Sequence, residues 1–348
     1  MSLESMGFVQ LWLSGSKPQY LKVDMNTLFG KTVLALCLGA TGLALAQDMQ
    51  TDNGTIPSKI KHRISPGLLS SDAPPTGSTG QATPPITFHG GPVIGGAPNI
   101  HLIWYGNWNQ ANGSDTPAAQ TLVRDFMSGI SGSNHLAINT GYTGSGSTQV
   151  SGVLAAPQEA NVGYIKGVRA KRLRDSDITN IVSTYIASHG GAQTNATYFV
   201  LTSSDVNETS GFCTQYCGWH NSGTIAGATV RYSFVGNANR CLSSCAIQSV
   251  SPNNNPGVDG MISVLVHELE EALTDPDINA WKDSAGAENA DKCAWTFGQN
   301  ASALPNGSFY NVSLPAPSLS GANRNYLVQR NLKAQDSKCY VDGVLNTQ

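Results

Sequence analysis

Three polar residues near the end of one apolar segment have the spacing of a metal-binding helix. The segment 258–274 is mostly apolar in its first half and carries His267, Glu268 and Glu271 in its second half. On an α-helix, residues four apart lie one turn apart on the same face, so His267 and Glu271 can reach a single cation. The arrangement imitates the His-Glu-x-x-His helix of zinc peptidases, whose Glu acts on metal-bound water. Glu268 is therefore the candidate catalytic residue, a general base.

The second ligand of this helix is a carboxylate where the zinc peptidases have a histidine. An oxygen ligand suits harder ions, so we keep calcium as the alternative to zinc. The remaining ligands must come from outside the helix, and we predict Glu288 and Asp291, which lie on a separate segment next to Cys293. Other candidate ligands are His220, which follows Cys217, and the acidic residues Asp275, Asp277 and Asp283.

Two other interpretations stay open, one for this helix and one for a group of aromatic residues. The helix 258–274 can instead carry a solvated polar face that ends in an acidic turn. Acidic residues at a helix C-terminus oppose the macrodipole, which makes that interpretation less natural. Elsewhere, Trp104, Tyr105, Trp108 and Trp219 could line a carbohydrate platform, although aromatic residues beside a strand usually belong to the core.

The N-terminal region predicts secretion. Residues 25–46 contain a Lys-bearing start, an apolar run and the small residues Ala44-Leu45-Ala46, which is the pattern of a signal peptide. The apolar run is shorter than the about 20 residues that a membrane-spanning helix needs. We therefore interpret residues 1–24 as an upstream extension, 25–46 as the signal peptide and 47–85 as a flexible leader rich in Ser, Thr, Pro and Gly.

Cysteine usage and sequons agree with an extracellular chain. An even number of cysteines in a secreted protein indicates disulfides. The two Cys-x-x-x-Cys units favour local bridges Cys213–Cys217 and Cys241–Cys245, which leaves Cys293 for Cys339; a cysteine zinc site is the alternative. Candidate glycosylation sites in Asn-x-Ser/Thr sequons are Asn53, Asn112, Asn195, Asn207, Asn300, Asn306 and Asn311.

The elements that would position the candidate site follow from periodicity. We predict strands over 101–105, 198–201 and 228–234, an amphipathic helix after Thr116-Pro117, a second helix from about 175 and a third over 258–274. The fold class is α/β or α+β: a single domain with a mixed β-sheet and packed helices, stabilised by disulfides. A net charge of −3 with 12% charged residues gives no footprint for nucleic acid or an anionic membrane.

Several stretches together resemble the exordium or phosphate-induced protein family of secreted plant proteins. They are Ile86–Pro92, His101–Trp108, Phe212–His220, Arg240–Cys245, Gly257–Met261 and the terminal Lys338-Cys339. The resemblance covers the folded part of the chain and implies an exordium-like domain over 86–348. It further implies residence in the cell wall or apoplast and a role in growth or nutrient responses, without an established reaction.

The chain departs from the plant pattern at the third helix, where those members have uncharged residues in place of His267, Glu268 and Glu271. It thus resembles a branch that retains a zincin-like His-Glu-x-x-Glu helix. We carry three hypotheses forward. The first is an extracellular exordium-like protein with a metal site on this helix, the second is a secreted zinc metallopeptidase, and the third is a non-catalytic wall or glycan-binding protein. The expected partners are cell-wall or matrix components or a protein substrate.

Overall fold

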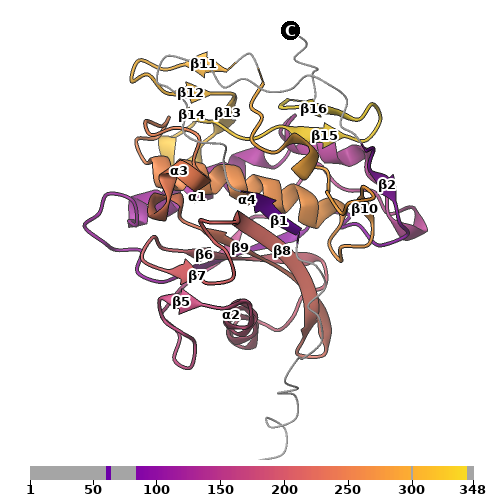
Figure 1. Cartoon of the computed structure of the whole chain (residues 1–348), viewed down its shortest axis with the longest axis horizontal. Helices are drawn as coiled ribbons and strands as arrows, with labels where there is room; N and C mark the ends of the chain where they lie inside the picture. Colours follow the sequence, from indigo (N-terminus) through magenta and orange to yellow (C-terminus); the bar gives the residue numbers. More distant parts are fainter. Residues whose placement is uncertain (1–59, 64–83, 299–300, 343–348) are drawn as a thin grey trace, which may run out of the picture. The chain divides into compact units, whose positions relative to one another are not determined.

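A six-stranded mixed sheet forms the centre of the fold (Figure 1). The structure, a computed structural model, describes residues 60–63, 84–298 and 301–342. In spatial order the strands are β1 (Ile60–Arg63), β8 (Tyr216–Ile225), β9 (Ala228–Gly236), β6 (Ala196–Thr202), β3 (Asn99–Tyr105) and β4 (Gln158–Gly163). The strands β4, β3, β6 and β9 run parallel to one another. Strand β8 is antiparallel to β9 on one side and to β1 on the other. The predicted mixed sheet is therefore confirmed.

Three long helices pack on this sheet, each close to where the sequence predicts it. Helix α1 (Pro117–Ile130) begins at the N-cap Thr116, whose hydroxyl accepts a hydrogen bond from the Ala119 amide. Helix α2 (Asp175–Ser188) packs on β6 and β9. Helix α4 (Pro256–Thr274) packs on β8 and β9 from the other side of the sheet, with α1 beside it (Figure 1).

The remaining elements are short, both before and after Asp277. The short helices are α3 (Leu242–Cys245) and five 3₁₀ turns, Leu136–Gly141, Ser145–Ser147, Ala238–Arg240, Asp291–Cys293 and Pro317–Leu319. The short strands are β2 (Thr87–Phe88), β5 (Arg172–Leu173), β7 (Asn207–Glu208), β10 (Trp281–Lys282), β11 (Ser302–Ala303), β12 (Phe309–Tyr310), β13 (Val312–Pro315), β14 (Asn323–Tyr326), β15 (Asn331–Lys333) and β16 (Lys338–Tyr340).

Helix α4 lies in the interior of the domain along its whole length. Asn255 caps it by accepting a hydrogen bond from the Val258 amide, and Pro256 occupies its first turn. Every residue from Met261 to Thr274 is buried, including the polar second half. The interpretation of α4 as a helix with a solvated polar face is therefore wrong. Loops from the C-terminal third of the chain cover α4 on the side away from the sheet (Figure 1).

The disulfides pair differently from the local bridges that the cysteine spacing favours. The bonds are Cys213–Cys241, Cys217–Cys245 and Cys293–Cys339, so only the third prediction is confirmed. Cys241 is the N-cap of α3 and Cys245 its last residue, one helical turn apart, so their side chains point the same way and do not face each other as a disulfide requires. Cys241 bonds instead to Cys213, just before β8, and Cys245 bonds to Cys217 in β8, which also excludes a cysteine zinc site at these residues.

The aromatic residues beside the strands belong to the core, as expected, and do not form the alternative carbohydrate platform. Trp104, Tyr105 and Trp219 are fully buried and Trp108 nearly so. Among the candidate glycosylation sites, Asn112, Asn195 and Asn306 are exposed and Asn207 is half-buried. The amide of Asn311 donates hydrogen bonds to the Phe297 and Val328 carbonyls.

The N-terminal predictions fall largely outside the described residues. These include the extension 1–24, the signal peptide 25–46, Asn53 and most of the leader 47–85; Asn300 also lies outside. Residues 60–63 of the leader form strand β1, which the sequence did not predict. None of the helices in the described ranges is long and apolar enough to cross a membrane.

Candidate metal centre

Three elements bring the predicted ligands together. Helix α4 supplies His267, Glu268 and Glu271, the neighbouring strand β8 supplies His220, and the loop around the 3₁₀ turn Asp291–Cys293 supplies Glu288 and Asp291. The disulfide Cys293–Cys339 anchors that loop two residues after Asp291. The sequence thus identified every member of this group, which we call the acidic cluster: His220, His267, Glu268, Glu271, Glu288 and Asp291.

One half of the acidic cluster is centred on His267. Its Nε2 lies 3.0 Å from Glu271 Oε1 and 3.6 Å from Asp291 Oδ1. The Asp291 amide donates to the same Glu271 oxygen at 3.1 Å, which fixes the loop against the helix. One ligand atom from each of the three residues lies within 4.8 Å of the others, so a single ion between them can bind all three.

The other half is centred on His220. Its Nε2 lies 2.8 Å from Glu288 Oε2 and 3.7 Å from Glu271 Oε2. The ligand atoms of His220, Glu268 and Glu271 also lie within 4.8 Å of one another. Glu271 therefore bridges the two halves, with one oxygen toward each imidazole.

Glu268 is the least satisfied member of the acidic cluster. Its side chain is fully buried, and neither carboxylate oxygen has a hydrogen-bond partner among the described residues. Strand β8 approaches the helix here through Gly218: a Cβ added to this glycine would lie 2.8 Å from Glu268 Oε1 and 2.7 Å from Val264 Cγ1. The absence of a side chain at position 218 leaves room for the Glu268 carboxylate beneath the strand.

Burial and mutual repulsion shift the ionisation of the carboxyl groups. Burial, followed by the charge of Asp291, raises the pKa of Glu271 to about 7. Burial and then the Glu271 charge raise the pKa of Glu268 and the pKa of Glu288 well above their usual values. In the absence of a cation, these carboxyl groups therefore hold protons near neutral pH.

The two imidazoles respond in opposite directions. Burial lowers the pKa of His220 to about 4, so its contact with Glu288 is a hydrogen bond between neutral groups. Burial also acts to lower the pKa of His267, but the charge of Glu271 and the hydrogen bonds of the ring with Asp291 and Glu271 outweigh burial and raise that pKa well above its usual value. Neutral His220 has the protonation state that a metal ligand needs.

The donor set fits a divalent cation. Four carboxyl groups meet in the interior, and no lysine or arginine in the described ranges forms an ion pair with any of them. Buried atoms without a hydrogen-bond partner in that part of the chain include Glu271 Oε2, Glu288 Oε1 and both oxygens of Glu268. Buried charges in proteins are normally paired or coordinate metals. An ion among these oxygens would satisfy them together.

Two of the other acidic candidates are paired with basic residues outside the acidic cluster. Asp277 forms a bidentate pair with Arg231, and Asp283 pairs with Lys292 at 2.5 Å, so we exclude both as ligands. Asp275 ends helix α4 and accepts hydrogen bonds from the amides of Asn279 and Ala280 through one oxygen. Its other oxygen has no hydrogen-bond partner among the described residues, and the side chain lies beside Glu288 at the margin of the acidic cluster.

A second buried pair on α4 was not predicted. His135 Nε2 lies 3.1 Å from Glu270 Oε1, and the other ring nitrogen of His135 contacts the Val341 carbonyl. Both side chains are almost fully buried. The partners are separated by more than a hundred residues, so local spacing could not reveal them. Glu270 therefore has a partner that its neighbour Glu268 does not have.

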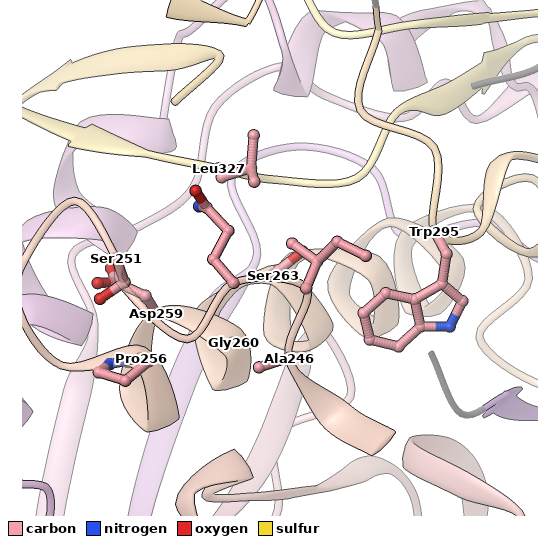
Figure 2. Close-up of a pocket in the computed structure, with 10 residues that line it drawn as sticks. Ala246, Ser251, Pro256, Asp259, Gly260, Ser263, Trp295 and Leu327 are labelled. Carbon is pink, nitrogen blue, oxygen red and sulfur yellow. The ribbon is translucent and has the colours of Figure 1, made fainter. Parts of the chain in front are cut away.

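A small pocket lies at the N-terminal half of α4, away from the acidic cluster. Figure 2 shows its lining, with Asp259, Gly260 and Ser263 from the helix, Trp295 at one side and Leu327 above. The single carboxylate in the lining accepts hydrogen bonds from Asn253. The pocket contains no histidine or cysteine and carries none of the predicted site residues.

Comparison with known proteins agrees with this domain. Residues 86–341 match the family described as "Phosphate-induced protein 1 conserved region". The chain belongs to this family. Protein EXORDIUM-like 3 of Arabidopsis thaliana is 29% identical over 276 residues, which cover 70% of this chain and 79% of that protein.

Other relatives carry similar names. Protein EXORDIUM-like 5 of Arabidopsis thaliana is 31% identical over 246 residues, covering 61% of this chain and 65% of that protein. Protein PHOSPHATE-INDUCED 1 of Nicotiana tabacum is 27% identical over 245 residues, covering 62% of this chain and 74% of that protein. No solved structure matches the chain. The resemblance on which the sequence interpretation rested is thus confirmed.

Proposed function

We propose that this exordium-family protein is secreted and binds one divalent metal ion at the acidic cluster. The observation that carries the proposal is a group of four carboxyl groups and two imidazoles from α4, β8 and residues 288–291. All but Asp291 are fully buried, and no lysine or arginine in the described ranges forms an ion pair with any of them. His267, Glu271 and Asp291 are the primary ligands. His220 and Glu288 complete the set from the opposite side.

The ligand types favour zinc over calcium. Calcium takes six to eight oxygen ligands, whereas imidazole nitrogen suits zinc and other transition ions. Helix α4 and strand β8 each contribute a histidine next to Glu271. The sequence had placed only one histidine in the preferred ligand set, so the position of His220 strengthens zinc as the ion. Calcium is the alternative ion, and a metal analysis would find it if the carboxylate oxygens supply most of the ligands.

A second function, metal-dependent hydrolysis of a peptide, is favoured by one observation. Glu268 follows the ligand His267 in the sequence, and both of its carboxylate oxygens lack a hydrogen-bond partner among the described residues. A zinc ion, when bound, lowers the pKa of a coordinated water to about 7 and so supplies a nucleophile. A bound cation would favour the ionised form of Glu268, and its carboxylate could then accept a proton from that water and return it.

Metal analysis of the secreted protein tests the proposal. We expect about one equivalent of zinc by mass spectrometry, and its loss in His267→Ala and in Glu271→Gln. Asp283→Asn is the matched control, because Asp283 lies in the same acidic stretch but pairs with Lys292. Wild-type protein that carries no metal after dialysis against trace zinc would refute the metal centre. Retention of the ion by both ligand variants would show that it binds elsewhere.

Secretion is part of the same proposal. The three disulfides are typical of proteins that fold in an oxidising compartment, and the Ala44-Leu45-Ala46 pattern supports removal of a signal peptide. The partners we propose are cell-wall or matrix components, or a protein substrate. N-terminal sequencing of the protein from culture medium tests the removal of the signal peptide, with Gln47 as the expected first residue.

A further inference from the structure

The leader contributes a strand to the sheet at its one antiparallel end. Strand β1 pairs with β8 in the register Ile60 with His220, Lys61 with Trp219 and His62 with Gly218. It is the outermost strand on this side, and β8 is the strand on which it lies. More than 150 residues separate the two strands in the sequence, so this is a long-range tertiary contact.

The register places β1 directly beside the acidic cluster. His220, opposite Ile60, is a member of the cluster. Gly218, opposite His62, is the residue whose missing side chain leaves room for Glu268. Strand β1 also lies next to helix α4, as Figure 1 shows. The backbone of the leader therefore runs along the edge under which the candidate base and a candidate ligand lie.

Strand β1 resembles a peptide bound at the edge of a sheet more than a strand of the core. It has four residues, its register shifts between His62 and Arg63, and it comes from a stretch rich in Ser, Thr, Gly and Pro. An edge strand presents unpaired N–H and C=O groups that pair readily with another extended chain. Such strand addition binds through the main chain and so accepts many sequences.

We propose that the outer edge of β8 is a binding site for an extended polypeptide and that β1 of the chain's own leader occupies it. The occupant lies along β8 opposite His220 and Gly218, and displacement of the leader opens the edge to a peptide from another molecule. The substrate class is thus an unfolded or extended peptide. The peptide site itself is independent of the metal; only its role in hydrolysis rests on the function proposed above.

Proline substitutions in the full chain test the occupancy of this edge. In an antiparallel pair, residues alternate between those that exchange hydrogen bonds with the partner strand and those that do not. Proline is tolerated at an edge only where the N–H faces away from the sheet. Lys61→Pro and His62→Pro must therefore differ: one releases β1, and the other is the matched control that leaves it bound.

Hydrogen exchange and peptide binding report the release. We expect the outer amides of β8 to exchange about tenfold faster in the releasing variant than in the wild type or the control variant. A labelled synthetic peptide of residues 58–66 should then bind the releasing variant and restore the protection. It should bind the wild-type chain at least about tenfold more weakly, because the edge is occupied. A peptide with proline at both 61 and 62 should not bind.

The outcomes separate this proposal from the metal centre. Equal exchange of the β8 amides in all three proteins, or no peptide binding to either proline variant, would overturn the peptide site even if one equivalent of zinc is present. Peptide binding that persists when His267→Ala is added to the releasing variant would support the site without any metal.

Discussion

Replacing Glu268 by glutamine should stabilise the metal-free protein. The side chain of Glu268 is fully buried beneath Gly218, and neither oxygen has a hydrogen-bond partner in the described part of the chain. Glu271, one turn away from His267 on the same helix, adds repulsion that raises the pKa of Glu268 further. A glutamine has the same size, carries no charge and can donate two N–H groups to the neighbouring carboxylates.

The size of the effect follows from the cost of a buried polar group without a partner. That cost is about 1–3 kcal/mol in the free energy of unfolding, which we expect Glu268→Gln to recover. For a domain of this size, 1 kcal/mol corresponds to a shift of about 2–4 °C in the melting temperature. The variant should therefore melt about 2–12 °C higher than the wild type when both are in excess chelator.

Glu270→Gln is the matched control. Glu270 is on the same helix and is equally buried, but its carboxylate lies 3.1 Å from His135 Nε2. Burial opposes protonation of His135, yet Glu270 and the Val341 carbonyl together raise the pKa of His135 above its usual value. Removing the charge of Glu270 weakens this pair, so we expect Glu270→Gln to lower the melting temperature under the same conditions.

The pH dependence of the unfolding free energy tests the effect of Glu268→Gln independently. The unfolded chain releases the Glu268 proton near pH 4.5, whereas the folded, metal-free protein retains it to a much higher pH. The unfolded state then binds fewer protons, so this group makes stability fall as pH rises above 4.5. The advantage of Glu268→Gln over the wild type should therefore grow between about pH 5 and 8. His220, with its lowered pKa, destabilises both proteins equally in acid and cancels in the comparison.

Thermal unfolding followed by circular dichroism in chelator, at several pH values, is the assay. A Glu268→Gln variant that melts at or below the wild-type temperature across this range would refute the argument that Glu268 is an unsatisfied buried carboxyl. So would an advantage that shrinks as pH rises. Added zinc should reverse the order, because the wild type gains an ion whose binding needs deprotonated ligands.

Three further outcomes are expected. Gly218→Ala should lower both thermal stability and zinc content, because the new Cβ would lie 2.7 Å from Val264 Cγ1. Gly223→Ala on the same strand should change neither, because its Cβ would lie 3.7 Å from the nearest atom of Tyr232. Replacing Cys293 and Cys339 together by serine should cost about 2–4 kcal/mol in unfolding free energy by denaturant titration, and should weaken zinc affinity because the loop that carries Asp291 is released. Asn311 should carry no glycan in site-resolved mass spectrometry of the secreted protein, since its amide is bonded to two carbonyls in the fold.

The local elements and the residues of the candidate site could be read from the sequence. Helix α4 follows from its apolar run, although it begins two residues before the predicted start at 258, and the alignment of His267 with Glu271 follows from helical geometry. Glu288 and Asp291 were predicted because acidic residues beside Cys293 were available as outside ligands, and the fold places both of them against α4.

The long-range pairings could not be read in the same way. Strand β8 escaped prediction because its sequence, with Gly218, His220, Asn221 and Gly223, lacks the alternation of a half-buried strand. Both misassigned disulfides depend on that strand lying beside α3. Strand β1 depends on the same edge. Tertiary placement of one strand therefore decided the three features that local patterns missed.

Anomalous diffraction from crystals of the secreted protein, recorded on both sides of the zinc absorption edge, tests the metal centre most directly. We predict one zinc peak, with His267 Nε2, a Glu271 oxygen and an Asp291 oxygen about 2.0–2.2 Å from it. A map without a peak at the acidic cluster in crystals grown with zinc, with Glu268 and Glu271 hydrogen-bonded to each other as protonated acids, would contradict the account.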